Sequence, residues 1–228
     1  AAGAWFVGED SGDYAGSAVA PAGDTNGDGY DDVLVGAYNN HDGGSDAGKA
    51  YLLSGPLSGY AIPSASFIGQ YANDNAGYAL SSAGDVNADG YADMLIGAHE
   101  NDDSAADAGK AYLVLGPATG SIDLSAADAF FLGESEDDQA GRAVAPAGDV
   151  DGDGYDDVLI GAWQNSEVDT DAGKAYLLRG PLSGTIDLAQ SDAWFLGELD
   201  HDHAGSALSS AGDVNGDGYD DVLIGAYG

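Results

Sequence analysis

The chain has 228 residues, 44% of them hydrophobic, and carries 40 Asp and Glu against 5 Lys and Arg, for a formal net charge of -35. It is long enough to bury a core, and its charge excludes anionic partners such as nucleic acid. It contains no cysteine, which excludes disulfides and thiolate metal sites. No apolar run approaches the roughly 18 residues that cross a bilayer, so we expect no membrane span.

Four short apolar runs, separated by Gly, Asp, Asn and Pro, make up the first unit of the chain. They cover roughly Trp5–Gly8, Ser17–Gly23, Asp32–Ala37 and Lys49–Ser54. Runs of this length, bounded by turn residues and without helical periodicity, indicate strands joined by turns. The second run consists of small residues, whereas the first and fourth carry bulky ones. This gradient from small to bulky side chains suits a sheet that is arranged radially, with small residues at the crowded axis and bulky ones toward the rim.

The unit recurs from Ala4, Ser66, Ala129 and Ala193, giving repeats of approximately 4–65, 66–128, 129–192 and 193–228, the last incomplete. The first spacing is three residues shorter because Gly55 to Gly69 spans 14 residues where the later units span 17. Four-stranded units repeated in this way predict an all-β fold, a β-propeller forming a single domain or part of one. A linear solenoid or tandem β-sandwiches are the alternatives. A unit of this size is short for most sandwiches and long for a β-helix coil.

A nine-residue phrase follows the second run of every unit: DTNGDGYDD, DVNADGYAD, DVDGDGYDD and DVNGDGYDD. Each copy places oxygen-bearing side chains at positions 1, 3, 5 and 9 and glycine at position 6, which is how a short loop wraps a hard cation. A backbone carbonyl at position 7 can add another oxygen. The predicted ligands are Asp24, Asn26, Asp28, Tyr30 and Asp32; Asp85, Asn87, Asp89, Tyr91 and Asp93; Asp149, Asp151, Asp153, Tyr155 and Asp157; and Asp213, Asn215, Asp217, Tyr219 and Asp221.

Ligation by oxygen alone favours calcium over zinc or copper, and magnesium is the weaker candidate because it keeps its waters. We therefore expect about four Ca2+ ions per chain. The loop is not an EF-hand, because Val35 occupies the twelfth position where that motif has Glu. An Asp- and Gly-rich turn without metal is the alternative, which four intact copies make less attractive. Two carboxylates about 4 Å apart repel by roughly 4 kcal/mol at an effective dielectric near 20, so calcium should stabilise the fold.

The pattern F-x-G, G-x-A-(V/L), AGD with the nine-residue phrase, and (V/M)-L-(V/I)-GA resembles the FG-GAP repeat, the blade of the integrin α-subunit propeller and of many bacterial surface proteins. The resemblance covers essentially the whole chain. It implies that the cation loop joins the first and second strands of a blade, and it carries the ligand roles onto the residues just named.

Two features depart from that family. Its usual Pro after Gly-Ala is replaced by Tyr38, His99, Trp163 and Tyr227, and four repeats stand in place of the usual seven. Strand counting makes the N-terminal AWFVG the outer strand of a blade whose inner strands lie elsewhere. The ring could close within four repeats, through a homo-oligomer, or through continuation of a longer chain. The start at AAGAWF, without Met or a signal peptide, suggests a processed product or a piece of a longer chain.

Two further sets of acidic loops should lie on the face opposite the cation loops, which the resemblance makes the ligand-binding face for a protein or glycan. One set runs 10–14, 71–75, 135–139 and 199–203, and the other 38–46, 99–107 and 163–171. The aromatic residues after Gly-Ala could stack on sugars there, although packing between loops is favoured. Asp13, Asp74, Asp138 and Asp202 recur at one position and could hold a second cation, although capping of turns is favoured.

The remaining charged residues suggest no catalytic site. His201 and His203 share a face of an extended segment, but no other repeat keeps them, and we expect a solvated loop. Lys49, Lys110 and Lys174 should neutralise neighbouring acids. Arg142 and Arg179 have no obvious partner in the sequence.

These features predict an extracellular, calcium-binding propeller, not an enzyme, that acts in adhesion, surface assembly or ligand binding. Loops of this kind need the high free calcium found outside cells, and the lack of cysteine fits a prokaryotic surface protein. The acidity serves solubility or fits a saline habitat. The alternative is a carbohydrate-binding or polysaccharide-degrading module on the same propeller. Near identity of the repeats argues against catalysis, because catalytic sites break symmetry.

Overall fold

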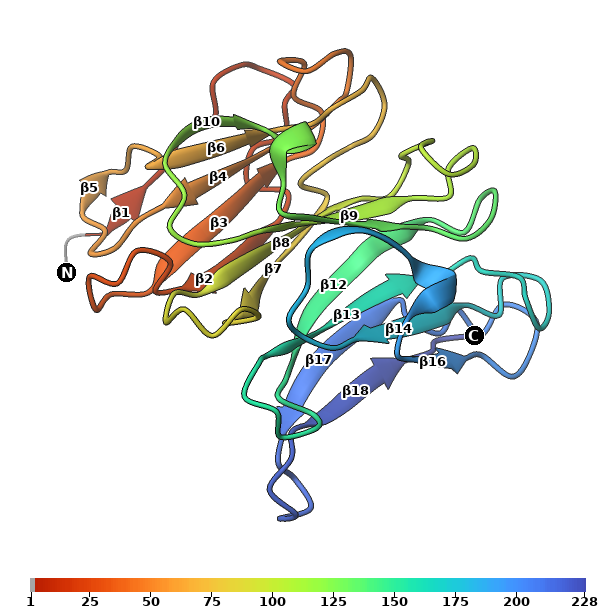
Figure 1. Ribbon diagram of the computed structural model, residues 1–228. Helices are drawn as coiled ribbons and strands as arrows, with labels where there is room; N and C mark the ends of the chain where they lie inside the picture. Colours follow the sequence, from red (N-terminus) through yellow and green to blue (C-terminus); the bar gives the residue numbers. More distant parts are fainter. Residues whose placement is uncertain (1–2) are drawn as a thin grey trace.

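The computed structural model describes residues 3–228, in which short β-strands and two single-turn 3-10 helices are formed. The strands assemble into blades that follow one another along the chain as an arc (Figure 1). Within each complete blade four neighbouring strands pair antiparallel. The all-β fold of propeller blades predicted from the sequence is confirmed.

Each complete blade takes three strands from one repeat and its outer strand from the start of the next repeat. The first blade consists of β2 (Val19–Gly23), β3 (Asp32–Ala37), β4 (Lys49–Leu53) and β6 (Ala65–Ile68). The second consists of β7 (Ala79–Gly84), β8 (Asp93–Ala98), β9 (Lys110–Val114) and β11 (Ala129–Leu132). The third consists of β12 (Ala140–Gly148), β13 (Asp157–Ala162), β14 (Lys174–Leu178) and β16 (Ala193–Leu196). A half-blade follows, made of β17 (Ala207–Gly212) and β18 (Asp221–Gly225).

A parallel edge strand lies outside each of three outer strands, and the sequence patterns did not predict it. These edge strands are β5 (Gly59–Tyr60), β10 (Gly120–Asp123) and β15 (Gly184–Asp187), paired with β1 (Ala4–Trp5), β6 and β11. Because β6 and β11 are outer strands, the same pairing puts β1 in the position of an outer strand. The run expected over Trp5–Gly8 is paired only at Ala4 and Trp5. Among residues 3–228, β1 pairs with β5 alone, and β18 with β17 alone.

The three-residue difference between units has a structural cause. The 3-10 helices η1 (Leu124–Ala126) and η2 (Leu188–Gln190) follow β10 and β15, and the shorter first unit has none. Asp123 and Asp187 cap them by accepting from backbone N–H groups of Ser125 and Ala189. Leu124 and Leu188 are thereby buried between blades.

The core lies between successive blades. The inner strands β2, β7, β12 and β17 neighbour one another along the arc. Leu34 and Phe67 of the first blade pack with Met94, Ile96 and Tyr112 of the second, all fully buried. Burying each such side chain contributes about 1.5–3 kcal/mol. The central strands are buried on both faces, which explains why they read as continuous apolar runs rather than alternating ones.

The two ends of the blades carry different loops. The hairpins β2–β3, β7–β8, β12–β13 and β17–β18 lie together at one end, along the lower left of the arc in Figure 1, here called the hairpin end. The turns after the third strands also lie at the hairpin end. The connections from second to third strand and from outer strand to the next blade meet at the opposite end, where the Asp137 N–H donates to the Ala106 carbonyl at 2.9 Å. Within the described residues no helix is long and apolar enough to cross a membrane.

Candidate metal centres

All four nine-residue phrases occupy the hairpin end. Residues 24–32, here loop 1, connect β2 to β3, and residues 85–93 (loop 2), 149–157 (loop 3) and 213–221 (loop 4) connect the equivalent strands. The first residue of each loop follows the inner strand directly, and the ninth begins the second strand. The structure therefore brings the predicted ligands of each loop together at a strand-to-strand turn.

Backbone hydrogen bonds fold each loop around its first carboxylate. In loop 1, Oδ1 of Asp24 accepts from Gly27 N at 2.8 Å and Oδ2 accepts from Gly29 N at 2.9 Å. Asn26 Oδ1 accepts from Asp28 N at 2.9 Å, and Asp28 Oδ1 accepts from Tyr30 N at 3.0 Å. Turns of this kind are a preferred use of Asp and Asn side chains. They point positions 1, 3 and 5 toward the inside of the loop.

The position-6 bond recurs in every other loop, and the position-4 bond recurs in loops 3 and 4. The position-1 carboxylate accepts from the position-6 glycine at 2.9 Å in loop 2, 3.0 Å in loop 3 and 2.9 Å in loop 4. In loop 3, the ligand oxygens of Asp149, Asp151 and Asp153 all lie within 4.8 Å of one another. A cluster of oxygen donors without sulfur or imidazole suits calcium. The donor chemistry of the residues present therefore fits the predicted ion.

In loops 1 to 3 the aspartate at position 9 differs from the other predicted ligands because it is buried and braces the blade, whereas Asp221 of loop 4 is half-buried. Oδ2 of Asp93 accepts from Val86 N at 3.0 Å and Oδ1 accepts from Gly116 N at 2.9 Å. Asp32 and Asp157 hold the equivalent residues in the same way. Position 9 thus ties the loop to the turn after the third strand. Each carboxylate oxygen of Asp93 retains a second lone pair for a cation, whereas Oδ2 of Asp32 also accepts from the Thr25 hydroxyl.

The carboxyl groups of the loops have shifted pKa values in both directions. Burial, reinforced by the charges of Asp89 and Asp85, raises the pKa of Asp93 to about 7. Burial likewise raises the pKa of Asp157 to about 6. The pKa of Asp24 is lowered by the backbone hydrogen bond from Gly29. In loops 2 and 3 the buried position-9 carboxylate therefore resists ionisation, and a bound cation would favour its charged form.

Arg179 corrects one sequence-based interpretation, because it has partners. Its Nη1 lies 2.7 Å from Oδ2 of Asp151, and its Nη2 lies 3.1 Å from Oδ1 of Asp192. Loop 3 alone has Asp at position 3, where the other loops have Asn. The arginine thus offsets the one additional carboxylate of loop 3. The sequence could not show this pairing, since the two residues are 28 positions apart.

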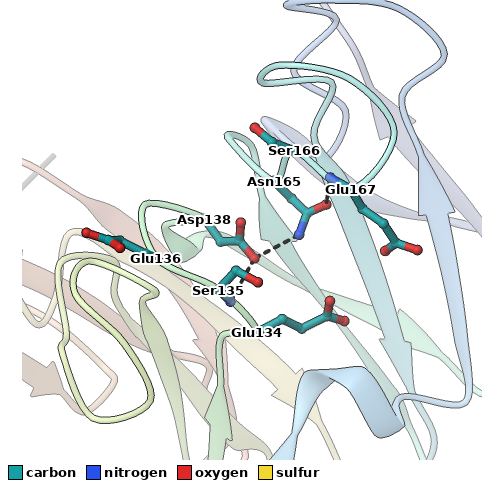
Figure 2. A pocket seen from close by; sticks show the side chains of 7 residues that line it. All are labelled: Glu134, Ser135, Glu136, Asp138, Asn165, Ser166 and Glu167. Carbon is teal, nitrogen blue, oxygen red and sulfur yellow. Dashed lines mark hydrogen bonds between the residues drawn. The ribbon is translucent and has the colours of Figure 1, made fainter.

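At the opposite end the acidic residues are already satisfied within the protein. Oδ2 of the buried Asp138 accepts from Ser135 N at 3.1 Å and from Asn165 Nδ2 at 2.7 Å, in an open pocket of about 250 Å³ (Figure 2). Asp74 makes the equivalent bonds with Tyr71 N and Asn101. Asp13 and Asp202 occupy the same position in their units. These bonds show that Asp74, Asp138 and Asp202 cap turns, whereas the carboxylate of Asp13 accepts from the Asn40 side chain.

Buried lysines neutralise the acids beside those turns. Nζ of Lys174 lies 2.8 Å from Oε1 of Glu134 and 2.6 Å from Oε2 of Glu167. Lys49 pairs in the same way with Glu9 and Asp42. Lys110 pairs with Asp103, and its second partner is Gln70. Burial disfavours the charge of Lys174, but the hydrogen bonds that it donates to both glutamates outweigh this effect and raise its pKa. The predicted neutralising role is what the geometry shows.

The aromatic residues after Gly-Ala pack against other aromatic side chains and Arg142 along the opposite end. The rings of Tyr14 and Tyr38 stack with centroids 5.5 Å apart. The Arg142 guanidinium lies 4.3 Å from the centroid of Trp163, whose ring also packs against His203 at 4.7 Å. Both sides of Trp163 thus have neighbours within the protein, which favours the packing interpretation over sugar stacking. Tyr227, packed on His203 at 5.1 Å, remains 64% exposed.

The two histidines near the C-terminus have separate environments. His201 is exposed and lies 3.2 Å from Asp171. His203 is half-buried, and its Nδ1 lies 3.1 Å from the Trp163 carbonyl oxygen. The expectation of a solvated loop therefore describes His201, whereas His203 belongs to the packed aromatic row. Within the described residues, neither histidine ring forms a hydrogen bond with a side chain that could act as a nucleophile.

Blades of this topology, repeated around an axis and joined at one end by acidic hairpin loops, define the class of propeller repeat proteins. The model of the FG-GAP repeat matches residues 15–53, 76–114, 140–178 and 204–228. The chain belongs to the FG-GAP repeat family. Each matched segment begins at or shortly before the start of an inner strand, and the three complete ones end with the third strand.

Curated relatives are integrin α subunits. Integrin alpha-V of Gallus gallus is 26% identical over 223 residues, covering 94% of this chain and 20% of that protein. Integrin alpha-PS2 of Drosophila melanogaster is 30% identical over 175 residues, covering 72% of this chain and 12% of that protein. Integrin alpha-IIb of Homo sapiens is 32% identical over 156 residues, covering 63% of this chain and 14% of that protein. The chain thus spans a fifth or less of the length of these relatives.

Proposed function

We propose that this chain is a calcium-stabilised FG-GAP propeller unit that acts outside the cell, without catalysis, in adhesion or ligand binding. The observation that carries the proposal is the fourfold repetition of one loop geometry, in which positions 1, 3 and 5 converge. The ligands would be the side chains at positions 1, 3, 5 and 9 together with the position-7 carbonyl of each loop. The bound ion would supply positive charge where the chain itself offers almost none.

The integrin names of the relatives support the adhesive part of the proposal. The partner would bind at the opposite end of the blades, where acidic loops from consecutive blades meet. A protein partner suits this surface better than a glycan, because the aromatic rings that could stack on sugars already pack within the chain. We further propose that the four repeats form one unit, either a domain or part of a longer propeller.

Thermal unfolding with and without calcium tests the metal role. At about 100 times Kd each occupied site adds roughly 2.7 kcal/mol, so several sites should raise Tm by more than about 10 °C. Asp85→Asn combined with Asp89→Asn should remove one ion from the calorimetric stoichiometry. Glu136→Gln, an exposed acid outside the loops, is the matched control and should remove none. Equal Tm values in calcium and in EGTA would overturn the proposal.

The ligand role needs a separate measurement. The chain should be applied, in calcium, to an array that carries both extracellular matrix proteins and glycans. We expect calcium-dependent binding to protein spots. Binding confined to glycans would contradict a protein partner and favour the carbohydrate-binding alternative.

A further inference from the structure

The eighth residue of each loop reaches back to the loop of the preceding blade. The N–H of Ala92 in loop 2 donates to the Asp24 carbonyl of loop 1 at 3.0 Å. The N–H of Asp156 donates to the Asp85 carbonyl at 3.1 Å, and that of Asp220 to the Asp149 carbonyl at 3.2 Å. Consecutive loops are therefore joined at the backbone of position 1, whose side chain is the first predicted ligand.

A second bond exists only where position 8 is aspartate. Oδ2 of Asp156 accepts from the Asp85 N–H at 2.7 Å, and Oδ2 of Asp220 accepts from the Asp149 N–H at 3.1 Å. Position 8 of loop 2 is Ala92, which has no carboxylate. The chain therefore contains two junctions with the bond and one without it.

The junction without the bond retains the backbone geometry that the carboxylate needs. Gly84 has φ +77°, and a Cβ on it would lie 2.1 Å from Oδ2 of Asp156, so only glycine leaves room for that carboxylate. Gly148 stands in the same relation to Asp220, at 2.0 Å. Gly23 has φ +75° and faces Ala92. An aspartate at position 92 would therefore find equivalent space.

We propose that Asp156 and Asp220 are positioning residues for calcium binding by the preceding loop, and that Ala92 leaves loop 1 without this support; this inference rests on the proposed function. The carboxylate fixes the backbone N–H of position 1. That residue's side chain organises the loop by accepting from positions 5 and 6. Holding a first ligand in its binding geometry reduces the ordering cost of binding.

Calcium titrations followed by 15N-1H NMR give one readout per loop. The position-6 amides of Gly29, Gly90, Gly154 and Gly218 each donate to the position-1 carboxylate, so their shifts report each loop separately. Asp156→Ala should weaken calcium binding at Gly90 about tenfold, the equivalent of one charge-assisted hydrogen bond. Gly29 and Gly218 should titrate as in the unchanged chain. Asp156→Asn, which keeps an acceptor oxygen, should restore most of the affinity.

Two matched variants use positions that the chain supplies. Asp31 is position 8 of loop 1, and no loop of the described chain precedes it, so Asp31→Ala removes the same charge without breaking a junction. It should leave every other loop unchanged. Ala92→Asp should create the missing bond and strengthen calcium binding at Gly29 by up to about tenfold.

The outcomes separate the two proposals. If no position-6 amide responds to calcium, the proposed function fails. If all respond but Asp156→Ala leaves the affinity at Gly90 within about twofold, less than one such bond is worth, the positioning role is wrong. Equal weakening of all four loops would mean general destabilisation and also contradicts it. If Asp156→Asn does not restore calcium binding, the negative charge of Asp156 is what matters and its hydrogen bond is not. That result would overturn the positioning role.

Discussion

The two ends of the blades hold similar numbers of acidic residues but compensate them differently. At the opposite end every complete blade has a buried lysine, such as Lys174 between Glu134 and Glu167. At the hairpin end of the described chain, Arg179 is the one basic side chain that pairs with a cation loop. The opposite end is therefore neutralised by residues that the chain supplies, whereas under the proposed function an ion from solution would neutralise the hairpin end. Calcium and mutations should affect the two ends separately.

The largest mutational effect should come from breaking the lysine compensation. Lys174→Met leaves two carboxylates facing each other without their cation. Because both glutamates are partly exposed, we expect a loss near the lower limit for a broken buried pair, about 3 kcal/mol. Lys110→Met is the matched comparison and should cost less, since Gln70 replaces one carboxylate in that blade. Urea unfolding in saturating calcium measures both changes.

Calcium binding should be unchanged in both lysine variants, because the lysines lie at the end of the blades away from the loops. A larger loss in Lys110→Met than in Lys174→Met would show that charge compensation is not what the lysines supply. A loss of calcium affinity in either variant would show that the two ends are coupled.

A medium effect should appear when the pH of metal-stripped protein is lowered. Burial raises the pKa of Asp74 and of Asp138 from 3.8 to about 6, so the folded state binds more protons than the unfolded state between pH 4 and 6. The stability contributed by these groups is complete below about pH 4 and is lost as the pH rises through 6. Without calcium, Tm should therefore rise by about 5 °C from pH 7 to pH 5.

The control for the pH effect is Asp138→Asn, which removes one titrating group and should reduce the rise. In saturating calcium the rise should diminish or reverse, because protons compete with the ion for the hairpin-end carboxylates. A Tm of the metal-stripped protein that falls steadily from pH 7 to pH 5 would contradict the prediction.

The smallest effect should follow from removing the one cation that the hairpin end possesses. Arg179→Leu copies the residue of the second blade, Leu115, and frees Asp151 from its ion pair. Since exposed pairs are worth up to about 1 kcal/mol, loop 3 should bind calcium about threefold more tightly. The Gly154 amide in an NMR titration reports this affinity, and Leu115→Arg should weaken loop 2 in return. Weaker binding in Arg179→Leu would mean that the arginine positions Asp151.

The fold was predictable because its signals are local and repeated. The runs DVLVGA, DMLIGA and DVLIGA predict central strands, and the glycine within each allows the next blade to approach closely. A Cβ at Gly97, for example, would lie 1.9 Å from the Gly141 carbonyl oxygen. The parallel edge strands such as β10 escaped prediction because GSID is short, exposed and without apolar alternation. Their pairing depends on a neighbour about 55 residues away.

The candidate metal centres were predictable as far as one loop defines them. Spacing alone indicated positions 1, 3, 5 and 9 and the position-7 carbonyl, and in loop 3 the ligand oxygens of positions 1, 3 and 5 lie within 4.8 Å of one another. It did not reveal the bracing role of Asp93, because Gly116 lies 23 residues away. The contact of Asp156 with Asp85 spans 71 residues and depends on blade packing. Contacts between blades therefore could not be predicted from the sequence of a single repeat.

The position of the outer strand has a practical consequence for dissecting this chain. Because β6 and β11 come from the start of the following repeat, a cut at a repeat boundary such as Ser66 or Ala129 would remove the outer strand from one blade and leave an unpaired strand on the next piece. An excision that keeps the four antiparallel strands of a blade together should fall after Gly69, Gly133 or Gly197, and the first two of these cuts separate the edge strands β10 and β15 from their sheets. We expect the blade to be the unit that unfolds cooperatively, and the blade is offset by one strand from the repeat that is seen in the sequence.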